Sequence, residues 1–450
     1  MLRGAVSAAV LWFVASGRSV LQCSGAALAE PSAAAFAAVR TERGGALVSE
    51  FTLTKEAHVL SSEPRGECVA RGHDDKALMP GQDSSEHRLP TIALLFLLSS
   101  TGVHERVWRA WLDAAPSYAA FAIYAHLNKH TCPQVLHVDA RMGEGGDSSD
   151  DCTVAADSIL ADALIEPRVA HDRISLGIVT AERLLLRAAL RDGRCSRFVL
   201  LSEGSVPIWP ARFVAEALLA QPAMVGAWFD TLAHSSERER NKYHHSTQFF
   251  REQIPPDAYA KSSQWVALTR TEACEAVNDG TVARAFAVNC AMLKCNPTPG
   301  VDNFTKPEMI GRLRMAPDEL YFATLIRSRG MHQRTVCHGT HFAQVEMSHG
   351  GHALALAGSH SLTAARIMHI RQQATCELDT GMHQEGMTHL PPPASAPFFE
   401  FNHSVPVCAL FARKVPLSEQ DAYMRWQHVW NTIEEANRAV PGMRACLRPN

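Results

Sequence analysis

Short apolar runs alternate with longer amphipathic segments through the middle of the chain. The runs lie at 91–98, 120–127, 197–203 and 224–229, and the helical patterns pass through Trp108 and Leu112 and cover 179–190 and 211–220. Strands that are apolar on both faces must be covered on both faces. The pattern therefore predicts an α/β fold: a mostly parallel, twisted sheet with helices on both sides.

The two ends of the chain depart from this alternation. Residues 1–29 have a basic start, an apolar run and a small-residue site at Ala27 to Ala29, which predicts a signal sequence. Arg18 interrupts the run before the ~20 residues that span a bilayer, so a cleaved peptide or a short signal anchor is expected. Residues 30–90 resemble a stem of low order. The folded domain is expected over 91–450 and ends in an amphipathic helix after Leu417.

Composition narrows the class of protein. The 450 residues are 46% hydrophobic and 20% charged, which suffices for one large core with appendages. A net charge of -3 gives no basic surface for nucleic acid. Twelve cysteines without a CxxC pair favour scattered disulfides in an oxidising lumen, and sequons at Asn303 and Asn402 agree with secretory entry.

Several common catalytic motifs are absent from the sequence. There is no GxGxxG, GxxxxGK[ST], HExxH or GxSxG, and no Asp-x-Asp triplet of the kind that holds a divalent metal in nucleotide-sugar enzymes. The 22 histidines include the pair His244 and His245 and the group Cys337, His338 and His341, but these lack the regular spacing of metal ligands. We therefore predict no metal site, and a diphosphate would have to be held by cationic side chains.

Asp318 and Glu319 follow Pro317 at the start of an apolar helical pattern. Proline favours the first helical position, and acids in the first turn gain ~0.3 to 1 kcal/mol from the helix dipole. The same dipole would keep a carboxylate ionised at the rim of a pocket, which suits a general base. The residues alone leave both interpretations open.

Polar residues follow the predicted strands at their carboxyl ends, where sheets of this kind bind ligands. These residues are Ser99, His126, Asn128, Ser202, Glu203 and Ser205. Arg413 and Lys414 close a later apolar run and form either a solvated strand end or a cation pair for a leaving diphosphate. Trp265 is either a core anchor or part of a carbohydrate subsite.

Taken in order, these stretches resemble the core-2/I-branching β-1,6-N-acetylglucosaminyltransferases and their plant-type relatives, glycosyltransferase family 14. The matching pieces are "TIALLFLL", "AIYAHLN", "GIVTAERLLLRAAL", "RFVLLSEGSVPIWP", "SSQWVALTR", "APDELYFATLI" and "CALFARK". They span Thr91 to Lys414 in the order found in the family.

The resemblance implies a GT-A type fold, a UDP-sugar donor, inversion at the anomeric carbon and no cofactor or required metal. It implies that Glu319 is the general base and that Lys414, with Arg413 beside it, contacts the donor diphosphate. It places Ser99, His126 and Asn128 on the nucleotide-sugar side, and Ser202, Glu203, Ser205, Arg240, Lys242, Trp265 and Asp318 in the acceptor cleft.

Three positions depart from the family pattern. Asn128 stands where an aspartate is common in the animal members. The region of a second diphosphate-binding arginine holds His349 and His352 but no arginine, and Val415 replaces the usual phenylalanine. These departures leave Arg413 and Lys414 to supply most of the positive charge.

The sequence thus predicts an inverting, metal-independent glycosyltransferase of the secretory pathway, in the Golgi lumen, either membrane-anchored or secreted. It would move N-acetylglucosamine, xylose or glucuronic acid from a UDP-sugar to a hydroxyl of a glycan or glycoprotein. The alternatives are an inactive lumenal carbohydrate-binding protein of the same fold and a metal-dependent enzyme that uses the histidines.

Overall fold

The computed structural model describes most of the predicted folded domain. It covers residues 89–99, 103–129, 157–171, 175–220, 222–225, 227–229, 231–293, 315–336, 339–343, 345–346, 352–353, 355–356, 361–372, 409–416 and 422–439. The predicted signal sequence, nearly all of the predicted stem, and Asn303, Cys337, His338, His349 and Asn402 lie outside these residues.

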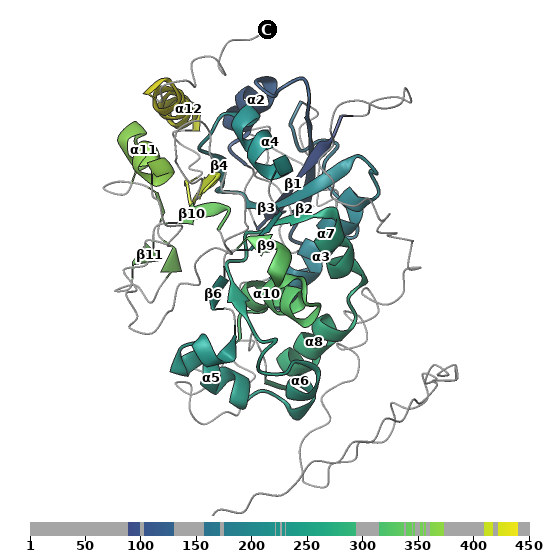
Figure 1. Ribbon diagram of the computed structural model, residues 1–450. Coiled ribbons are helices and arrows are strands. Elements are labelled where there is room, and N and C mark those ends of the chain that lie inside the picture. Colours follow the sequence, from purple (N-terminus) through teal and green to yellow (C-terminus); the bar gives the residue numbers. More distant parts are fainter. Residues whose placement is uncertain are drawn as a thin grey trace, which may run out of the picture. The chain divides into compact units, whose positions relative to one another are not determined.

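The main sheet has the strand order β2-β1-β3-β8-β5-β9. Figure 1 labels β1, β2, β3 and β9 of this sheet. Its strands are β1 (Thr91–Leu98), β2 (Ala120–Leu127), β3 (Cys195–Ser202), β5 (Ala223–Met224), β8 (Ala267–Thr269) and β9 (Thr335–Val336). β1 is parallel to β2 and β3, and β5 is parallel to β9, whereas β8 runs antiparallel to both of its neighbours. The predicted α/β architecture with a mostly parallel sheet is confirmed.

Alternate residues of β1 enter two separate cores, which explains why the whole strand is apolar. Phe96 belongs to one core, with Trp108 of helix α2 (Glu105–Asp113) and α4 (Ala211–Ala220). Leu95 belongs to the other core, with α3 (Leu176–Leu190) and α10 (Pro317–Ser328). Helices therefore cover both faces of the sheet, as the pattern predicts.

A second, three-stranded sheet brings the late part of the chain to the end of β3. Its order is β10 (His341–Ala343), β13 (Phe411–Arg413) and β4 (Val206–Pro207). β13 pairs antiparallel with β4, which begins four residues after β3 ends. This pairing places the strand that carries Arg413 beside the loop at 203–205.

The remaining elements complete the domain. They are η2 (Leu232–His234), α5 (Glu237–His244), α6 (Gln248–Gln253), α7 (Arg270–Asn278), α8 (Thr281–Leu293), η3 (Met331–Arg334), α11 (Ala364–Gln372), α12 (Ala422–Ala439), and the strand pairs β6 (Ala227–Phe229) with β7 (Lys261–Ser262) and β11 (Val345–Glu346) with β12 (His352–Ala353). The predicted C-terminal helix is α12, which contacts α11 and α2. Within the described residues, no helix is both long and apolar enough to span a membrane.

The element boundaries differ from the predicted ones in three places. β1, β2 and α4 occupy the predicted residues, but α3 begins three residues earlier than predicted, at Leu176, and β3 covers Cys195–Ser202 instead of 197–203. The single strand predicted at 224–229 is two short strands, β5 and β6, which belong to different sheets. An apolar run alone does not reveal that its two halves pair with different partners.

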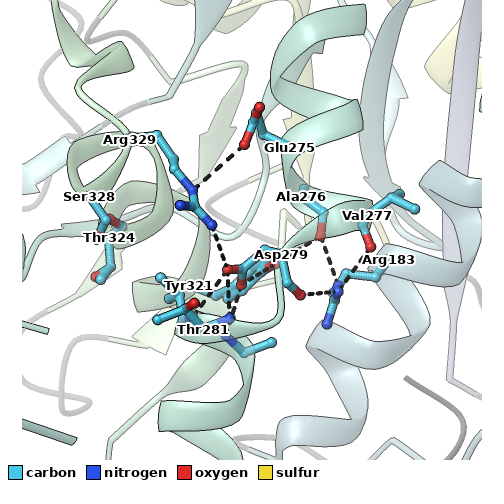
Figure 2. A network of polar contacts seen from close by, with 12 residues as sticks. Arg183, Glu275, Ala276, Val277, Asp279, Thr281, Tyr321, Thr324, Ser328 and Arg329 are labelled. Atoms are coloured by element: carbon cyan, nitrogen blue, oxygen red, sulfur yellow. Dashed lines mark hydrogen bonds and ion pairs between the residues drawn. The ribbon is translucent and has the colours of Figure 1, made fainter. Parts of the chain in front are cut away.

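A buried polar network fixes α10 against its neighbours, with Asp279 at its centre (Figure 2). The Asp279 side chain is fully buried and caps α8 by accepting hydrogen bonds from the backbone N–H groups of Thr281, Val282 and Ala283. It also accepts a hydrogen bond from the Tyr321 hydroxyl at 3.2 Å and lies 3.4 Å from the Arg329 guanidinium. Asp279 therefore joins the start of α8 to the middle and end of α10.

Arg183 extends this network to α3 (Figure 2). Its guanidinium donates to the carbonyl oxygens of Ala276, Val277 and Asp279 at the end of α7. These are terminal carbonyls that have no partner within the helix, and a cation there complements the helix dipole. The network thus sets the position of α10 relative to three other helices.

Replacement of Asp279 by alanine should destabilise the domain by about 3 kcal/mol, because it removes a helix cap and leaves buried donors unsatisfied. The matched control is Glu275→Gln, which removes the exposed partner of Arg329 at 3.6 Å. The control should cost less than about 1 kcal/mol. Denaturant unfolding measures both, and equal losses would contradict a central role for Asp279.

Candidate active site

Ser99 and Glu203 meet at the carboxyl edge of the sheet, where β1 and β3 end side by side. The Ser99 backbone N–H donates to the Glu203 carboxylate at 3.2 Å, and the Ser99 hydroxyl donates to its other oxygen at 2.5 Å. Glu203 is half-buried, so its carboxylate borders both the fold and the solvent. The structure thus brings together two predicted site residues from strands about a hundred positions apart.

Ser202 and Ser205 shape the turn that carries Glu203. The Ser205 hydroxyl accepts a hydrogen bond from the Ser202 backbone N–H at 3.0 Å and lies 2.9 Å from the Ser202 hydroxyl. Both serines are buried, and the indole N–H of Trp108 donates to the Ser205 carbonyl at 3.1 Å. These hydrogen bonds hold the turn in shape.

The chain around Lys414 packs directly on this turn. The Val415 backbone N–H donates to the Gly204 carbonyl at 2.9 Å. A Cβ on Gly204 would lie 3.1 Å from the Val415 oxygen, so glycine permits the close approach. The Val415 carbonyl accepts from the ring nitrogen of His104, and burial lowers the pKa of His104 to about 4, which leaves the ring neutral. Val415 itself is buried in the first core.

Arg413 lies over the face of Trp265, with its guanidinium carbon 4.5 Å from the ring centroid. Trp265 is only 4% exposed, so it forms a buried platform for the cation. His341 packs beside both, and burial, followed by the positive charge of Arg413, lowers the pKa of His341 well below its usual value. The ring is therefore neutral, and Arg413 is the charged member of this group.

His126 and Asn128 clamp a neighbouring segment against the end of β2. The His126 ring accepts a hydrogen bond from the Val169 N–H at 3.0 Å, and burial lowers its pKa to about 3. The Asn128 amide donates to the His171 carbonyl at 2.9 Å and accepts from the His171 N–H at 3.4 Å. An aspartate could not make the first of these two bonds, which gives a local reason for asparagine at this position.

The two acids at the start of α10 point to different environments. Asp318 is buried at 9% exposure, whereas the Glu319 side chain is 31% exposed. Glu319 forms an ion pair with the Lys261 ammonium at 3.1 Å. Ala316, at the N-cap, makes no side-chain hydrogen bond to the helix. Both acids lie in the first turn, where a negative charge complements the helix dipole. Only Glu319 combines that position with access to solvent and a cationic partner.

Lys261 connects Glu319 to two further charged residues. Its ammonium also lies 3.2 Å from Glu239, and the same Glu239 oxygen lies 2.7 Å from Lys242. We call Lys242, Glu239, Lys261 and Glu319 the charge chain. Lys242 is buried within it, while the neighbouring Arg240 guanidinium donates to the Ser235 carbonyl. The two basic residues predicted in the cleft thus have internal partners.

Glu182 is a buried acid beside this site that the sequence analysis did not single out. It lies on α3 with no exposed surface, and its carboxyl accepts a hydrogen bond from the Gln264 amide at 2.9 Å. Burial, reinforced by the negative charge of Asp318, raises the pKa of Glu182 well above its usual value despite that hydrogen bond. Its one sequence signal is an acid within the mostly apolar run "GIVTAERLLL".

Residues 261–265, which we call the bridging segment, connect the acidic and the cationic parts of the site. Lys261 pairs with Glu319, Gln264 binds Glu182, and Trp265 lies under Arg413. The Trp265 carbonyl also accepts a hydrogen bond from Thr340, next to β10. Five consecutive residues thus contact α10, α3 and β13, which come from distant parts of the sequence.

The histidine groups do not assemble into a ligand set among the residues that the structure describes. No cluster of three or more His, Cys, Asp or Glu side chains suitable for a metal ion occurs there. His244 and His245 are both exposed, at the end of α5.

Two comparisons relate the chain to known proteins. The model of a family described as "Branch: Core-2/I-Branching enzyme" matches residues 124–371. Glycosyltransferase BC10 of Oryza sativa subsp. japonica is 28% identical over 170 residues, which are 36% of this chain and 39% of that protein. The match therefore spans about two fifths of the length of this relative. The family match includes the charge chain and the bridging segment, whereas Arg413 and Lys414 lie beyond it.

Replacement of Glu182 by glutamine should stabilise the protein at neutral pH but not near pH 4. Because the folded-state pKa of Glu182 is raised, the wild type loses stability as pH rises above the unfolded value of ~4.3, where only the unfolded chain ionises. Glutamine cannot ionise and keeps an acceptor for Gln264. Thermal melts from pH 4 to 8 measure the difference, with Glu252→Gln, exposed on α6, as control. A gain that is independent of pH would contradict the buried, neutral carboxyl.

Proposed function

This chain belongs to the Core-2/I-branching enzyme family, as its motifs predicted, and on that premise we propose that it is an inverting glycosyltransferase. The donor would be a UDP-sugar and the acceptor a hydroxyl of a glycan or glycoprotein. The observation that carries the proposal is the position of Glu319: a half-exposed carboxylate at a helix start, paired with Lys261. The bridging segment links it to the cation at Arg413.

Glu319 acts as the general base in this proposal. The acceptor oxygen attacks the anomeric carbon from the face opposite the diphosphate, and the bond from that carbon to the diphosphate oxygen breaks. Glu319 takes the proton of the acceptor hydroxyl as the new glycosidic bond forms. A single displacement of this kind inverts the configuration at the anomeric carbon and needs only one carboxylate.

Arg413 and Lys414 stabilise the negative charge that grows on the departing diphosphate. Charge-assisted hydrogen bonds from guanidinium and ammonium groups are stronger than neutral ones, and a fixed cation needs little reorganisation during the reaction. Trp265 and the Val415–Gly204 hydrogen bond support such fixation. In this proposal the cation pair supplies the charge that a divalent metal supplies in other nucleotide-sugar enzymes.

The remaining predicted site residues divide between binding and support. We propose that Ser99 and Glu203, at the sheet edge, form hydrogen bonds with sugar hydroxyls. His126 and Asn128 would act on the donor side, and Ser202 and Ser205 in the acceptor cleft, through the backbone segments that they hold. Arg240 and Lys242 would support the cleft from behind through their internal partners.

An inactive carbohydrate-binding protein of the same fold is the second candidate. Two features favoured it: Asn128 and the missing second arginine. Asn128 here donates a hydrogen bond to the His171 carbonyl that an aspartate could not donate. Release of UDP separates the two candidates, since both could bind the nucleotide but only an enzyme would turn it over. A screen of UDP-N-acetylglucosamine, UDP-xylose and UDP-glucuronic acid, with and without glycan acceptors, tests activity and donor choice together.

The secretory pathway, in the lumen of the Golgi, is the location that we propose. The N-terminal signal pattern supports it, and anchored or secreted forms are both compatible with that pattern. Cys274 on α7 and Cys290 on α8 are disulfide-bonded, which agrees with an oxidising compartment, whereas Cys195 is free and buried.

Replacement of Glu319 by glutamine should lower kcat by ~10²- to 10⁴-fold, the usual contribution of a general base. If Glu319 only complemented the helix dipole, the same change would cost at most ~1 kcal/mol of stability and leave turnover intact. The matched control is Glu237→Gln, an exposed first-turn acid of α5. UDP release and thermal melts on both variants decide between the two roles.

Addition of EDTA should leave turnover unchanged. Replacement of Lys414 by methionine should lower kcat/KM by ~10²-fold or more, because the diphosphate loses one of its two cations. Arg212→Met removes an exposed cation on α4 and serves as the control for loss of charge. Loss of activity with EDTA that Mg²⁺ or Mn²⁺ restores would contradict metal independence and favour the metal-dependent alternative.

A further inference from the structure

The charge chain alternates in sign from the interior to the cleft. The exposed fractions of the side chains are 6% for Lys242, 8% for Glu239, 12% for Lys261 and 31% for Glu319. Two of its members come from α5, one from β7 and one from α10. Lys242 and Glu239 are buried and Lys261 is nearly so. Charges in such positions are costly unless each has a partner, and here each contacts a neighbour of opposite sign.

Lys261 is shared almost equally between two carboxylates. Its ammonium lies 3.1 Å from Glu319 and 3.2 Å from Glu239. Burial opposes the charge on Lys261, but Glu319 and Glu239 outweigh it and raise the lysine pKa. Lys261 therefore remains a cation, and its attraction is divided between an interior acid and the acid at the cleft.

Glu239 determines how that attraction is divided. Burial opposes its ionisation, but Lys261 and Lys242 together outweigh burial and lower its pKa, so Glu239 is an anion. Its second oxygen lies 3.5 Å from the Tyr259 hydroxyl. Glu239 thus has three partners, Lys242, Lys261 and Tyr259.

We propose that Lys261 and Glu239 are positioning residues for proton transfer at Glu319. Lys261 orients the Glu319 carboxylate through the 3.1 Å ion pair, while Glu239 offsets part of the lysine charge that Glu319 faces. A carboxylate paired with an uncompensated lysine would lose its proton readily but accept a new proton poorly. The efficiency of general-base catalysis falls when the basicity of the base falls. This inference rests on the proposed function of Glu319.

Other charged groups around the charge chain are few among the described residues. Arg238 on α5 is exposed, and its positive charge repels that of Lys242 and so contributes to lowering the pKa of Lys242. Tyr259 is buried, and burial followed by the charge of Glu239 raises its pKa well above the usual value, so it stays neutral. Asp318 on α10 and Glu182 on α3 lie on the inner side, where Glu182 is neutral. Lys261 thus forms ion pairs with Glu239 and Glu319.

The test is the acid limb of the kcat/KM profile against pH, measured by UDP release. Lys261→Met should move the acid limb to higher pH by ~1 unit or more, because an adjacent opposite charge is removed. Glu239→Gln should move it the other way, to lower pH, and lower the plateau, because the full charge of Lys261 then acts on Glu319. Lys261→Arg keeps the charge and should restore the wild-type limb.

Glu237→Gln, on the same helix but exposed, is the matched control and should leave the limb unchanged. Because Glu239→Gln leaves Lys242 buried without its partner and could fail to fold, the double variant Glu239→Gln/Lys242→Met is measured beside it. The double variant removes one charge of each sign and should also move the limb to lower pH. A purely structural role would lower activity in these variants without opposite shifts.

The outcomes separate this inference from the proposed function. If Glu319→Gln abolishes turnover but the acid limbs of Lys261→Met and the Glu239 variants coincide with that of the wild type, the positioning role is wrong and the general base stands. If the wild-type protein releases no UDP, or Glu319→Gln turns over normally, the proposed function itself fails. Opposite shifts, together with rescue by arginine, would establish the positioning role.

Discussion

The ion pair between Lys261 and Glu319 is the interaction on which the arrangement of the site depends. A lysine that is 12% exposed requires anionic partners, and local sequence provides none, because its neighbours are Ala260 and Ser262. The two partners come from α5 and α10, which lie 22 and 58 positions away. The need to satisfy one buried ammonium therefore fixes how two helices approach the short strand β7.

The rest of the fold fixes the position of this ion pair relative to the carboxyl edge of the sheet. Asp279 and Arg183 lock α10 to α3, α7 and α8, so the helix that carries Glu319 has little freedom to move (Figure 2). On the opposite side, the pairing of β13 with β4 fixes Arg413 beside the turn after β3. The bridging segment lies between these two parts and contacts both. Its backbone therefore sets the position of Glu319 relative to Arg413.

How much of this arrangement could be predicted depends on the range of the interactions. β1 was predicted to the residue because a strand buried on both faces leaves a continuous apolar run. The bounds of β2, a half-buried edge strand, were also predicted to the residue. β5, β7 and β8 are two or three residues long and too short to show a period. Glu239, Lys261 and Glu182 were not singled out, because a long-range ion pair or a buried carboxyl leaves almost no trace in local sequence. The family resemblance indicated Glu319, whereas its partner became visible only through tertiary contacts.

Adjacent acids with equivalent sequence context can thus serve different purposes. Asp318 and Glu319 both lie in the first turn of α10, and a helix places successive side chains about 100° apart, so one can face the interior while the next faces the cleft. Asp318 lies on the side of Glu182, where its charge helps keep that carboxyl neutral. Glu319 lies on the side of Lys261, whose ammonium is 3.1 Å from its carboxylate. Two carboxyl groups in opposed environments are the usual basis for dividing structural and catalytic work, and here one helical step of rotation creates the division.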